Sequence, residues 1–357
     1  MKIHFVLAVA MIIFSQADVN GQGCVAIRST GASCSIQKPH EDSSKWQINT
    51  NYRFFRSYKH FKGRDEQKER QVLHNEVINY SHSLDLSIIR KLNDRWSLAL
   101  NMPLLANKRT SLYEHGFKER GSTESFGLGD MRLSASYWLV DPKKNTRGNI
   151  QVGMGIKFAT GDYNYKDYWT GAGPGGTDTL FTVDQSIQLG DGGTGITTEF
   201  NAYYRIAGAF QAYASGFYLF NPKEVNGTRT YREYVSATLY NETICSVPDQ
   251  YQFRAGFSYG INKFSFLAGG RIDAIPVYDL IGKSTGFRRP GYAIAVEPGV
   301  TYMTGRTNLF LTVPFAVERN RTQSVTDKER SKNSGTYVIG DAAFSDYVIN
   351  LGMSVRF

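Results

Sequence analysis

The sequence is poor in cysteine and proline and, beyond its first residues, has no long hydrophobic run. There are 3 Cys and 10 Pro among 357 residues. So few cysteines exclude a disulfide-rich mini-scaffold, and glycine and proline without a three-residue period exclude collagen. No apolar stretch after residue 17 approaches the roughly 20 residues of a membrane-spanning helix, which excludes a helical membrane protein. Aromatic residues are abundant instead, with 22 Tyr and 22 Phe.

The first residues indicate an export signal. Lys2 gives a positive start, and residues 5–14 form an apolar stretch of about ten residues, which suits a signal-peptide core and is too short to cross a bilayer. Cleavage is expected after Ala17 or later, near Gln22. We assign residues 1–22 to the signal peptide, so the mature chain is expected to leave the cytoplasm.

From residue 45 onward the sequence alternates between apolar and polar positions. In 149–158, for example, Ile150, Val152 and Met154 oppose Gln151 and Gly153. This period of two is typical of a strand with one apolar face, and runs of about ten residues match a tilted strand that crosses a membrane. Twelve such runs are predicted, at 45–57, 75–91, 95–106, 126–139, 148–160, 193–206, 209–221, 251–261, 263–273, 291–303, 307–319 and 343–357.

The connections between these runs alternate in length. Short turns alternate with long segments at 58–74, 107–125, 161–192, 222–250, 274–290 and 320–342. Outer-membrane barrels pair short periplasmic turns with long extracellular loops, and single-chain barrels have even strand numbers. The sequence therefore predicts an all-β fold over residues 45–357, a transmembrane antiparallel up-and-down β-barrel of about 12 strands in the cell outer membrane, with both termini periplasmic.

Apolar and aromatic side chains occupy the face predicted to meet lipid. Because lipid cannot pair with backbone groups, the sheet must close on itself and turn its apolar face outward. The last run has this pattern up to the terminal Phe357, the kind of ending by which the barrel-assembly machinery recognises barrels for insertion. The aromatic residues predicted to face outward are Tyr80, Trp96, Tyr137, Phe158, Tyr204, Phe210, Tyr218, Tyr251, Tyr292, Tyr302 and Phe315.

The opposite face is predicted to line a lumen and carries charges of both signs. Two interpretations stay open: a polar path that contacts a solute, or paired side chains that brace the barrel wall. Its charged residues are Arg53, Asp85, Asp130, Arg132, Glu199, Arg205, Arg254, Arg271, Asp273, Glu297 and Glu318. Those expected to face a solute are Arg132, Glu199, Arg205, Arg254, Arg271 and Glu297.

Residues 23–44 precede the first predicted strand and show no strand period. Cys24 and Cys34 are expected to form a local disulfide in an oxidising compartment, which leaves Cys245 unpaired. The segment could fold into the lumen as a plug or remain a disordered tail. The predicted disulfide favours the plug.

Three short features carry a family resemblance: Gly127-Leu128-Gly129-Asp130-Met131-Arg132 at the start of a strand, Thr160-Gly161-Asp162-Tyr163 opening a loop, and the terminal Phe357. With them the barrel region resembles outer-membrane transporters related to the MetA-pathway of phenol degradation family and, more loosely, the FadL-like channels for hydrophobic compounds. The resemblance implies an outer-membrane barrel that passes or binds small hydrophobic or aromatic molecules. In FadL-like channels an N-terminal hatch plugs the lumen.

Other motifs indicate neither a cofactor nor an enzyme. Residues 190–195 fit the spacing of a dinucleotide-binding loop but lead into a strand instead of a helix, so no cofactor is expected and the glycines are assigned to a turn. Asp162 and Asp191 are weak candidates for Ca²⁺ ligands, and no metal is predicted. Ser81, His82 and Ser83 are consecutive on one strand, so His82 points away from both hydroxyls and does not activate either.

The formal net charge of +9 is concentrated in the predicted external loops. Outer-membrane lipids and the phosphates of lipopolysaccharide are the expected partners, although neighbouring acidic residues fit a plain solvated loop equally well. Nucleic acid is not expected, because the charges lie on separate loops of an exported protein. The basic loop residues are Arg56, Lys59, Lys62, Arg64, Lys68, Arg70, Lys108, Arg109, Lys118, Arg120, Arg319, Arg321, Lys328, Arg330 and Lys332.

The sequence thus predicts an outer-membrane channel or transporter-like barrel for small hydrophobic or aromatic solutes, and not an enzyme. One alternative is a non-transporting barrel that serves as a structural or docking partner in an outer-membrane assembly. A second alternative is an outer-membrane lipid hydrolase.

Overall fold

The computed structural model describes residues 44–116, 119–230 and 237–357. The predicted signal peptide and all but the last residue of the predicted plug, with Cys24 and Cys34, lie outside the described residues. They remain predictions.

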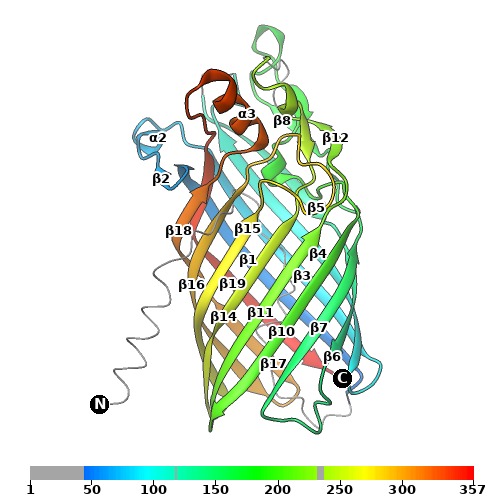
Figure 1. The fold of residues 1–357 in the computed structure, drawn as a ribbon. Helices are drawn as coiled ribbons and strands as arrows, with labels where there is room; N and C mark the ends of the chain where they lie inside the picture. Colours follow the sequence, from blue (N-terminus) through cyan, green and yellow to red (C-terminus); the bar gives the residue numbers. More distant parts are fainter. Residues whose placement is uncertain (1–43, 117–118, 231–236) are drawn as a thin grey trace, which may run out of the picture.

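Twelve antiparallel strand positions form a closed barrel, as the alternation predicts (Figure 1). Closure comes from β1 and β19, which pair from Gln47 with Arg356 to Phe61 with Ala342. Ten positions are single strands: β1 (Trp46–Lys62), β3 (Ile78–Lys91), β4 (Trp96–Ser111), β7 (Gly148–Lys157), β10 (Gly195–Ala207), β11 (Phe210–Phe220), β14 (Gln250–Ile261), β15 (Phe264–Ile275), β16 (Gly291–Thr304) and β19 (Ala342–Arg356). Two positions are interrupted: β5 (Gly121–Leu128) continues as β6 (Arg132–Trp138), and β17 (Thr307–Thr312) continues as β18 (Phe315–Arg321).

The two faces of the barrel wall differ as the alternation requires. Outward side chains are apolar and exposed, as Met154 is at 61% and Val296 at 51%. Inward side chains, such as those of Asn51 and Thr197, are buried. An apolar outer surface around a closed hydrogen-bonded sheet is the arrangement that lipid demands. No helix in the described ranges is long and apolar enough to cross a bilayer.

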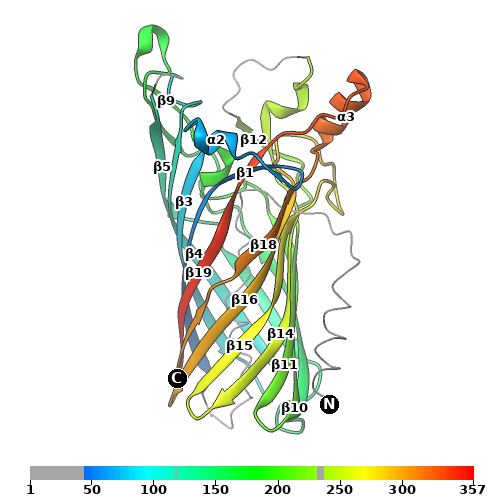
Figure 2. The ribbon, with the colours of Figure 1, turned by 90° about the vertical axis from the view of Figure 1, so that its left-hand side faces the viewer.

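The two ends of the barrel are unlike each other (Figure 2). The turn end holds the short connections, where Gly208 and Asn262 adopt positive φ, and it brings Trp46 beside Phe357, whose backbone N–H donates to the Trp46 carbonyl at 2.9 Å. The loop end holds the long connections. Their short elements are β2 (Asp65–Glu66), α2 (Glu69–Val72), β8 (Lys166–Trp169), β9 (Thr179–Thr182), β12 (Val225–Arg229), β13 (Ile244–Ser246) and α3 (Val325–Ser334), with 3-10 turns at Pro174–Gly176, Gln185–Ile187 and Tyr240–Glu242.

A β-bulge corrects the predicted orientation of Glu318, and a polar contact buries a residue that was predicted to meet lipid. In the pairing of β16 with β18, Ile294 lies opposite Glu318 and the next residue of β16 lies opposite Ala316, so one residue of β18 is extra. The extra residue reverses the alternation, and Glu318 shares the face of Ile294 instead of facing the lumen. Tyr292 has the outward orientation predicted for it, on the same face of β16 as Ile294, but it does not meet lipid, because it is fully buried and hydrogen-bonded to Arg64 and Glu318.

Candidate functional site

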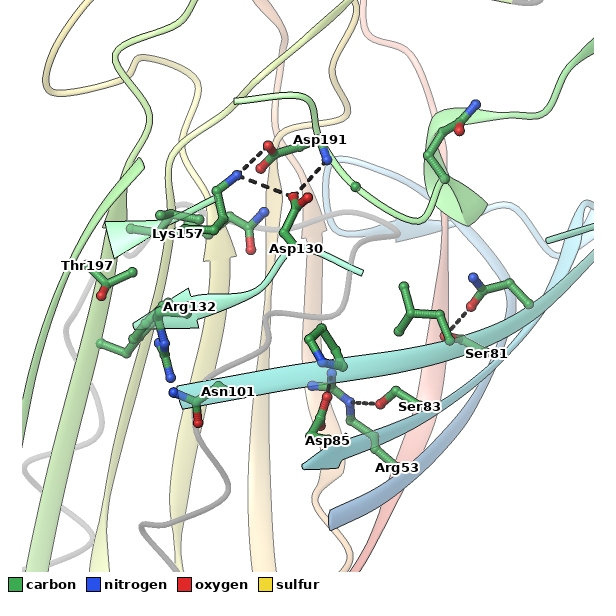
Figure 3. A pocket seen from close by; sticks show the side chains of 18 of the residues that line it. Arg53, Ser81, Ser83, Asp85, Asn101, Asp130, Arg132, Lys157, Asp191 and Thr197 are labelled. Carbon is green, nitrogen blue, oxygen red and sulfur yellow. Dashed lines mark hydrogen bonds and ion pairs between the residues drawn. The ribbon is translucent and has the colours of Figure 1, made fainter. Parts of the chain in front are cut away.

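A cavity of about 150 Å³ lies inside the barrel, towards the loop end (Figure 3). Its walls are the inward positions of the strands, which bring Asn51, Ser83, Asn101, Arg132 and Thr197 into one space because alternate residues of a strand point the same way. The wall carries five cationic side chains and three carboxylates among many neutral ones. The cationic residues are Arg53, Arg132, Lys157, Arg288 and Arg289, and the acidic residues are Asp85, Asp130 and Asp191.

The long connection 161–192 folds back into the barrel at its end, and we call residues 183–191 the inward segment. Val183, Ile187 and Leu189 are buried there, and Gln188 and Asp191 line the cavity. The Ile187 carbonyl accepts hydrogen bonds from inward side chains of the wall, Asn107 at 3.4 Å and Ser125. The inward segment therefore forms a ceiling over the cavity on the side of the loop end.

Asp184 anchors the inward segment by charge. Its carboxylate lies 2.7 Å from the guanidinium of Arg289, in the connection 276–290, and 3.5 Å from that of Arg109, at the end of β4. Burial opposes ionisation of the carboxyl, but the two guanidinium groups outweigh it and hold the pKa of Asp184 well below its usual range. The anchor is thus ionised at every pH at which an outer membrane works.

Three glycine-containing motifs that are far apart in the sequence meet at Asp130. This residue lies in the interruption between β5 and β6, and its carboxylate accepts the backbone N–H of Gly161 at 3.0 Å and that of Asp191 at 3.1 Å. Thr160 reinforces the junction by donating its hydroxyl to the Gly129 carbonyl at 2.9 Å. The motifs at 127–132, 160–163 and 190–195 therefore close the base of the long loop against the barrel wall.

Close backbone approach explains the glycines of this junction. A Cβ on Gly190 would lie 2.5 Å from an Asp130 carboxylate oxygen and 2.7 Å from the Gly161 carbonyl, and a Cβ on Gly161 would lie 2.6 Å from the Leu189 carbonyl. Lys157 completes the junction by ion pairs to Asp130 and Asp191. The prediction that residues 190–195 turn the chain back at the barrel rim agrees with this geometry.

Arg132, at the start of β6, has a looser environment than the other cations of the lumen. It is 6% exposed, and its nearest carboxylate oxygen, of Glu199, lies 4.0 Å from its Nη2. Its Nη1 is buried and has no hydrogen-bond partner in the part of the chain that the structure describes. The guanidinium lies over the ring of Phe217, 5.0 Å from the centroid.

The remaining predicted solute-facing residues are placed differently. Arg254 donates to Glu297 at 2.7 Å, and Arg271 lies 3.8 Å from Glu297 and 2.6 Å from Asp273, so these side chains form one ion-pair network across β14, β15 and β16. Such a network fits the bracing interpretation. None of its members lines the described cavity, and neither do Glu199 and Arg205, so Arg132 alone of the six predicted residues does.

Two further connections of the loop end pack around the inward segment. The guanidinium of Arg288 forms a buried ion pair with the carboxylate of Asp279, with 2.7 Å between nitrogen and oxygen. Gln185 donates hydrogen bonds to the carbonyls of Ser246 and Phe287. Cys245 lies in this packing as a free thiol, and burial raises its pKa to about 12. The sequence alone did not indicate these loop contacts, because loops lack the periodicity that locates strands.

The candidate hydrolase residues lie on opposite faces of β3. His82 faces outward, where its Nδ1 is 2.7 Å from the Tyr52 hydroxyl, while Ser81 donates to Asn107 in the lumen. Within the described ranges, no group of three or more His, Cys, Asp or Glu residues is arranged to hold a metal ion. Of the weak Ca²⁺ candidates, Asp191 pairs with Lys157 and Asp162 accepts the backbone N–H of Asn164.

Several basic residues predicted to lie in external loops form ion pairs within the loop end, and two of them, Arg109 and Arg321, lie at the ends of strands β4 and β18 instead of in loops. Arg109 donates to Glu114 at 2.7 Å, Arg70 lies 2.6 Å from Asp341, and Arg321 lies 3.2 Å from Asp327. Other basic residues of the loop end, such as Lys62 and Lys68, are exposed. Part of the positive charge therefore stabilises the loop end from inside.

Comparisons with known proteins identify the fold. No family model and no curated protein matches the sequence. The COG4313 outer membrane channel from Pseudomonas putida F1 has a similar structure, with a TM-score of 0.57 and 11% identity over 93% of this chain and 100% of that one. At that identity the likeness shows the fold alone, that of an outer-membrane β-barrel.

Two further structures have lower scores. The Pseudomonas putida toluene transporter TodX matches with a TM-score of 0.44 and 8% identity over 94% of this chain and 96% of its own. The NanC porin matches with 0.41 and 9% identity over 87% and 100%. The more specific resemblance to the MetA-pathway family stays a prediction.

Proposed function

We propose that residues 45–357 form an outer-membrane channel for small solutes. The observation that carries the proposal is a closed barrel with a polar, charged cavity in its lumen, under a ceiling made by a folded-in loop. A barrel that only braces itself needs no such space, because its paired side chains would fill it. Most charged side chains of the wall are held against it by ion pairs, as Lys157 is by Asp130 and Asp191, and therefore do not fill the space.

The proposed solute is small and has an apolar or aromatic body. Apolar side chains stand among the polar ones in the cavity wall, and they give such a body a surface to contact. These side chains are Phe55, Pro103, Leu105, Phe217, Leu219, Ile275 and Phe310. A cavity of about 150 Å³ accommodates a single small ring.

The proposal includes an orientation in the membrane. The loop end faces the outside and the turn end, with the last strand, faces the periplasm, as in barrels with short periplasmic turns. The exposed basic residues of the loop end, such as Lys68, are then available to lipopolysaccharide phosphates, and Phe357 is available to the barrel-assembly machinery during insertion. Residues 23–44 are proposed to plug the lumen from the periplasmic side.

Conductance in planar lipid bilayers tests the channel. The full chain, folded as judged by its heat-dependent migration on gels, is expected to give small steps of current. Deletion of residues 23–44 is expected to enlarge them, and unchanged steps would contradict the plug while leaving the channel intact. Absence of conductance in both proteins would overturn the channel and favour the non-transporting docking partner.

A further inference from the structure

Three hydrogen-bond donors without acceptors point into the cavity from neighbouring strands. The Nη1 of Arg132, the Nδ2 of Asn101 and the Nδ2 of Asn49 are all buried and have no acceptor in the described part of the chain. All three residues line the cavity. Buried hydrogen-bond donors ordinarily have an acceptor. Several unpaired donors that line one cavity therefore indicate a ligand that carries hydrogen-bond acceptors.

These donors lie in one row of the sheet. Asn49 of β1 pairs with Ser87 of β3, Ser87 with Asn101 of β4, and Asn101 with Arg132 of β6. Residues paired across antiparallel strands share a face, so the row lies on the inner wall. The amide oxygens are already used, since Asn101 accepts from Ser87 at 2.6 Å and Asn49 accepts from Gln47 at 2.8 Å. What remains towards the cavity from this row is donors, and in the next row the buried Oδ1 of Asn51 is an acceptor without a donor in the described part of the chain.

Arg132 and Arg53 lie farther from their counter-ions than the other cavity cations do. Arg53 is 3.9 Å from Asp85, and its Nε donates to Ser83 at 3.4 Å. Arg288 lies 2.7 Å from Asp279, and Arg289 lies 2.7 Å from Asp184. Arg132 meets its carboxylate, Glu199, only at 4.0 Å, which is outside hydrogen-bond distance. A buried guanidinium with this contact is well suited to bind an anionic group of a ligand.

Beside Arg132 the wall turns apolar. Phe217 lies under its guanidinium, and Leu219, on the same face of β11, lines the same cavity. A ligand with its anionic group on Arg132 and Asn101 would therefore place an apolar body on this surface. The second carboxylate whose charge acts on Arg132 is Asp85, which lies 3.9 Å from Arg53, and the cavity carboxylates Asp130 and Asp191 are held by Lys157.

We propose that Asn101 and Arg132, which are paired across β4 and β6, form a binding site for a small carboxylate with an apolar or aromatic body and hold its carboxylate. Asn49 lies two strands beyond Asn101, about 10 Å away, and does not contact a one-ring ligand bound there. This rests on the proposed channel function and specifies its solute class. The matching ligand has one negative charge and one ring. A neutral aromatic molecule of the same size would lack the carboxylate that accepts hydrogen bonds from these donors.

Calorimetry with the purified full chain in detergent tests the site, with benzoate as the probe. Benzyl alcohol, which has the ring without the charge, and acetate, which has the charge without the ring, are both expected to bind more weakly than benzoate. Arg132→Gln is expected to weaken benzoate binding about ten- to a hundredfold, the effect of losing one charge-assisted hydrogen bond. The matched control is Arg147→Gln, which removes the same charge from an exposed turn, and it is expected to leave benzoate binding unchanged.

A second variant is expected to tighten benzoate binding instead of weakening it. This variant keeps Arg132, so its result stands even if the fold does not tolerate the loss of Arg132. Glu199→Gln removes the carboxylate that competes for Arg132, so benzoate binding is expected to tighten severalfold. Weaker or unchanged binding in this variant would overturn the site, as would equal binding of benzoate and benzyl alcohol by the unaltered chain.

Conductance measured on the same preparations separates this proposal from the channel itself. Benzoate binding without any conductance would support the site and overturn the channel. Conductance without benzoate binding would support the channel and overturn the site.

Discussion

The carboxylate of Asp184 accepts two hydrogen bonds from the guanidinium of Arg289, at 2.9 and 2.7 Å, although 105 residues separate the two in the chain. One belongs to the inward segment and the other to the connection that precedes β16. The pair therefore fastens the ceiling of the cavity to a different loop of the same end.

Asp184→Asn is expected to release this fastening. It leaves Arg289 and Arg109 buried beside a neutral group, and breaking a buried pair costs about 3–5 kcal/mol. The variant should conduct more current per channel and be cleaved more readily by protease in the connection 161–192. Asp178→Asn, an exposed position of the same connection, is the control. If Asp184→Asn behaves like that control, the other contacts of the inward segment suffice to hold it.

Asp341 is expected to stabilise the fold above about pH 4 and to lose this effect in acid. Burial tends to raise the pKa of its carboxyl, but the hydrogen bond with His60 and the charge of Arg70 outweigh burial and lower the pKa to about 2. A folded-state pKa below the unfolded value gives stability that is complete above the unfolded pKa and disappears as the pH falls through the folded one. A shift of this size is worth about 2 kcal/mol at neutral pH.

Thermal unfolding followed by circular dichroism checks the Asp341 prediction. Asp341→Asn should melt below the unaltered protein at pH 6, and the gap should narrow towards pH 2. The exposed Asp65→Asn is the control, with little effect at either pH. A gap that stays constant between pH 6 and pH 2 would contradict the assignment.

Gly190→Ala is expected to open the junction at Asp130. The added methyl group would lie 2.5 Å from a carboxylate oxygen of Asp130, and overpacking of this kind costs about 1–3 kcal/mol. Protease cleavage after residue 160 should become faster while the barrel strands keep their circular dichroism. Gly270→Ala, where nothing lies within 4 Å of the new Cβ, should behave like the unaltered chain. Equal cleavage of the two variants would count against the junction.

The thiol of Cys245 is expected to resist alkylation in the folded protein. Its burial and its pKa of about 12 leave almost no thiolate at neutral pH, and the thiolate is the reactive form. In a Cys24→Ser, Cys34→Ser background, mass spectrometry should find no maleimide added at pH 7.5 until the protein is denatured, and one afterwards. Rapid labelling of the folded chain would show that the packing around β13 opens.

The predicted disulfide has a mass-spectrometric test of its own. In the otherwise unaltered chain, denatured without reductant, one maleimide should be added, and three after reduction. Three additions without reductant would contradict the pairing of Cys24 with Cys34.

The barrel was predictable from the sequence because alternation is a local signal. Within each run, the positions of the apolar residues show which side of the strand meets lipid, as Ile150 to Ile156 do on one face of β7. The error at Glu318 has the same origin: a bulge inserts one residue into β18, and a strict period of two then assigns every later residue to the wrong face.

The cavity was predictable only in part. Arg132 was expected to face a solute from its parity alone, and it lines the cavity. The inward segment was not expected, because Asp184 gains its role only from Arg109 and Arg289, which are distant in the sequence and are brought together by closure of the barrel. The glycine motifs did mark the junction, but nothing in their spacing shows that three of them share one aspartate.

In most loops a change of length also changes how the loop packs against the pore. The junction at Asp130, where the wall is interrupted, uncouples these two properties. Because both stems of the connection 161–192 are fixed there, through Gly161 and Asp191, the hairpin of β8 and β9 beyond them can lengthen, shorten or change its charge without reshaping the lumen. Surface variation and solute selection can therefore evolve independently in this chain. A binding epitope grafted at the hairpin tip would be carried by the same two anchor points.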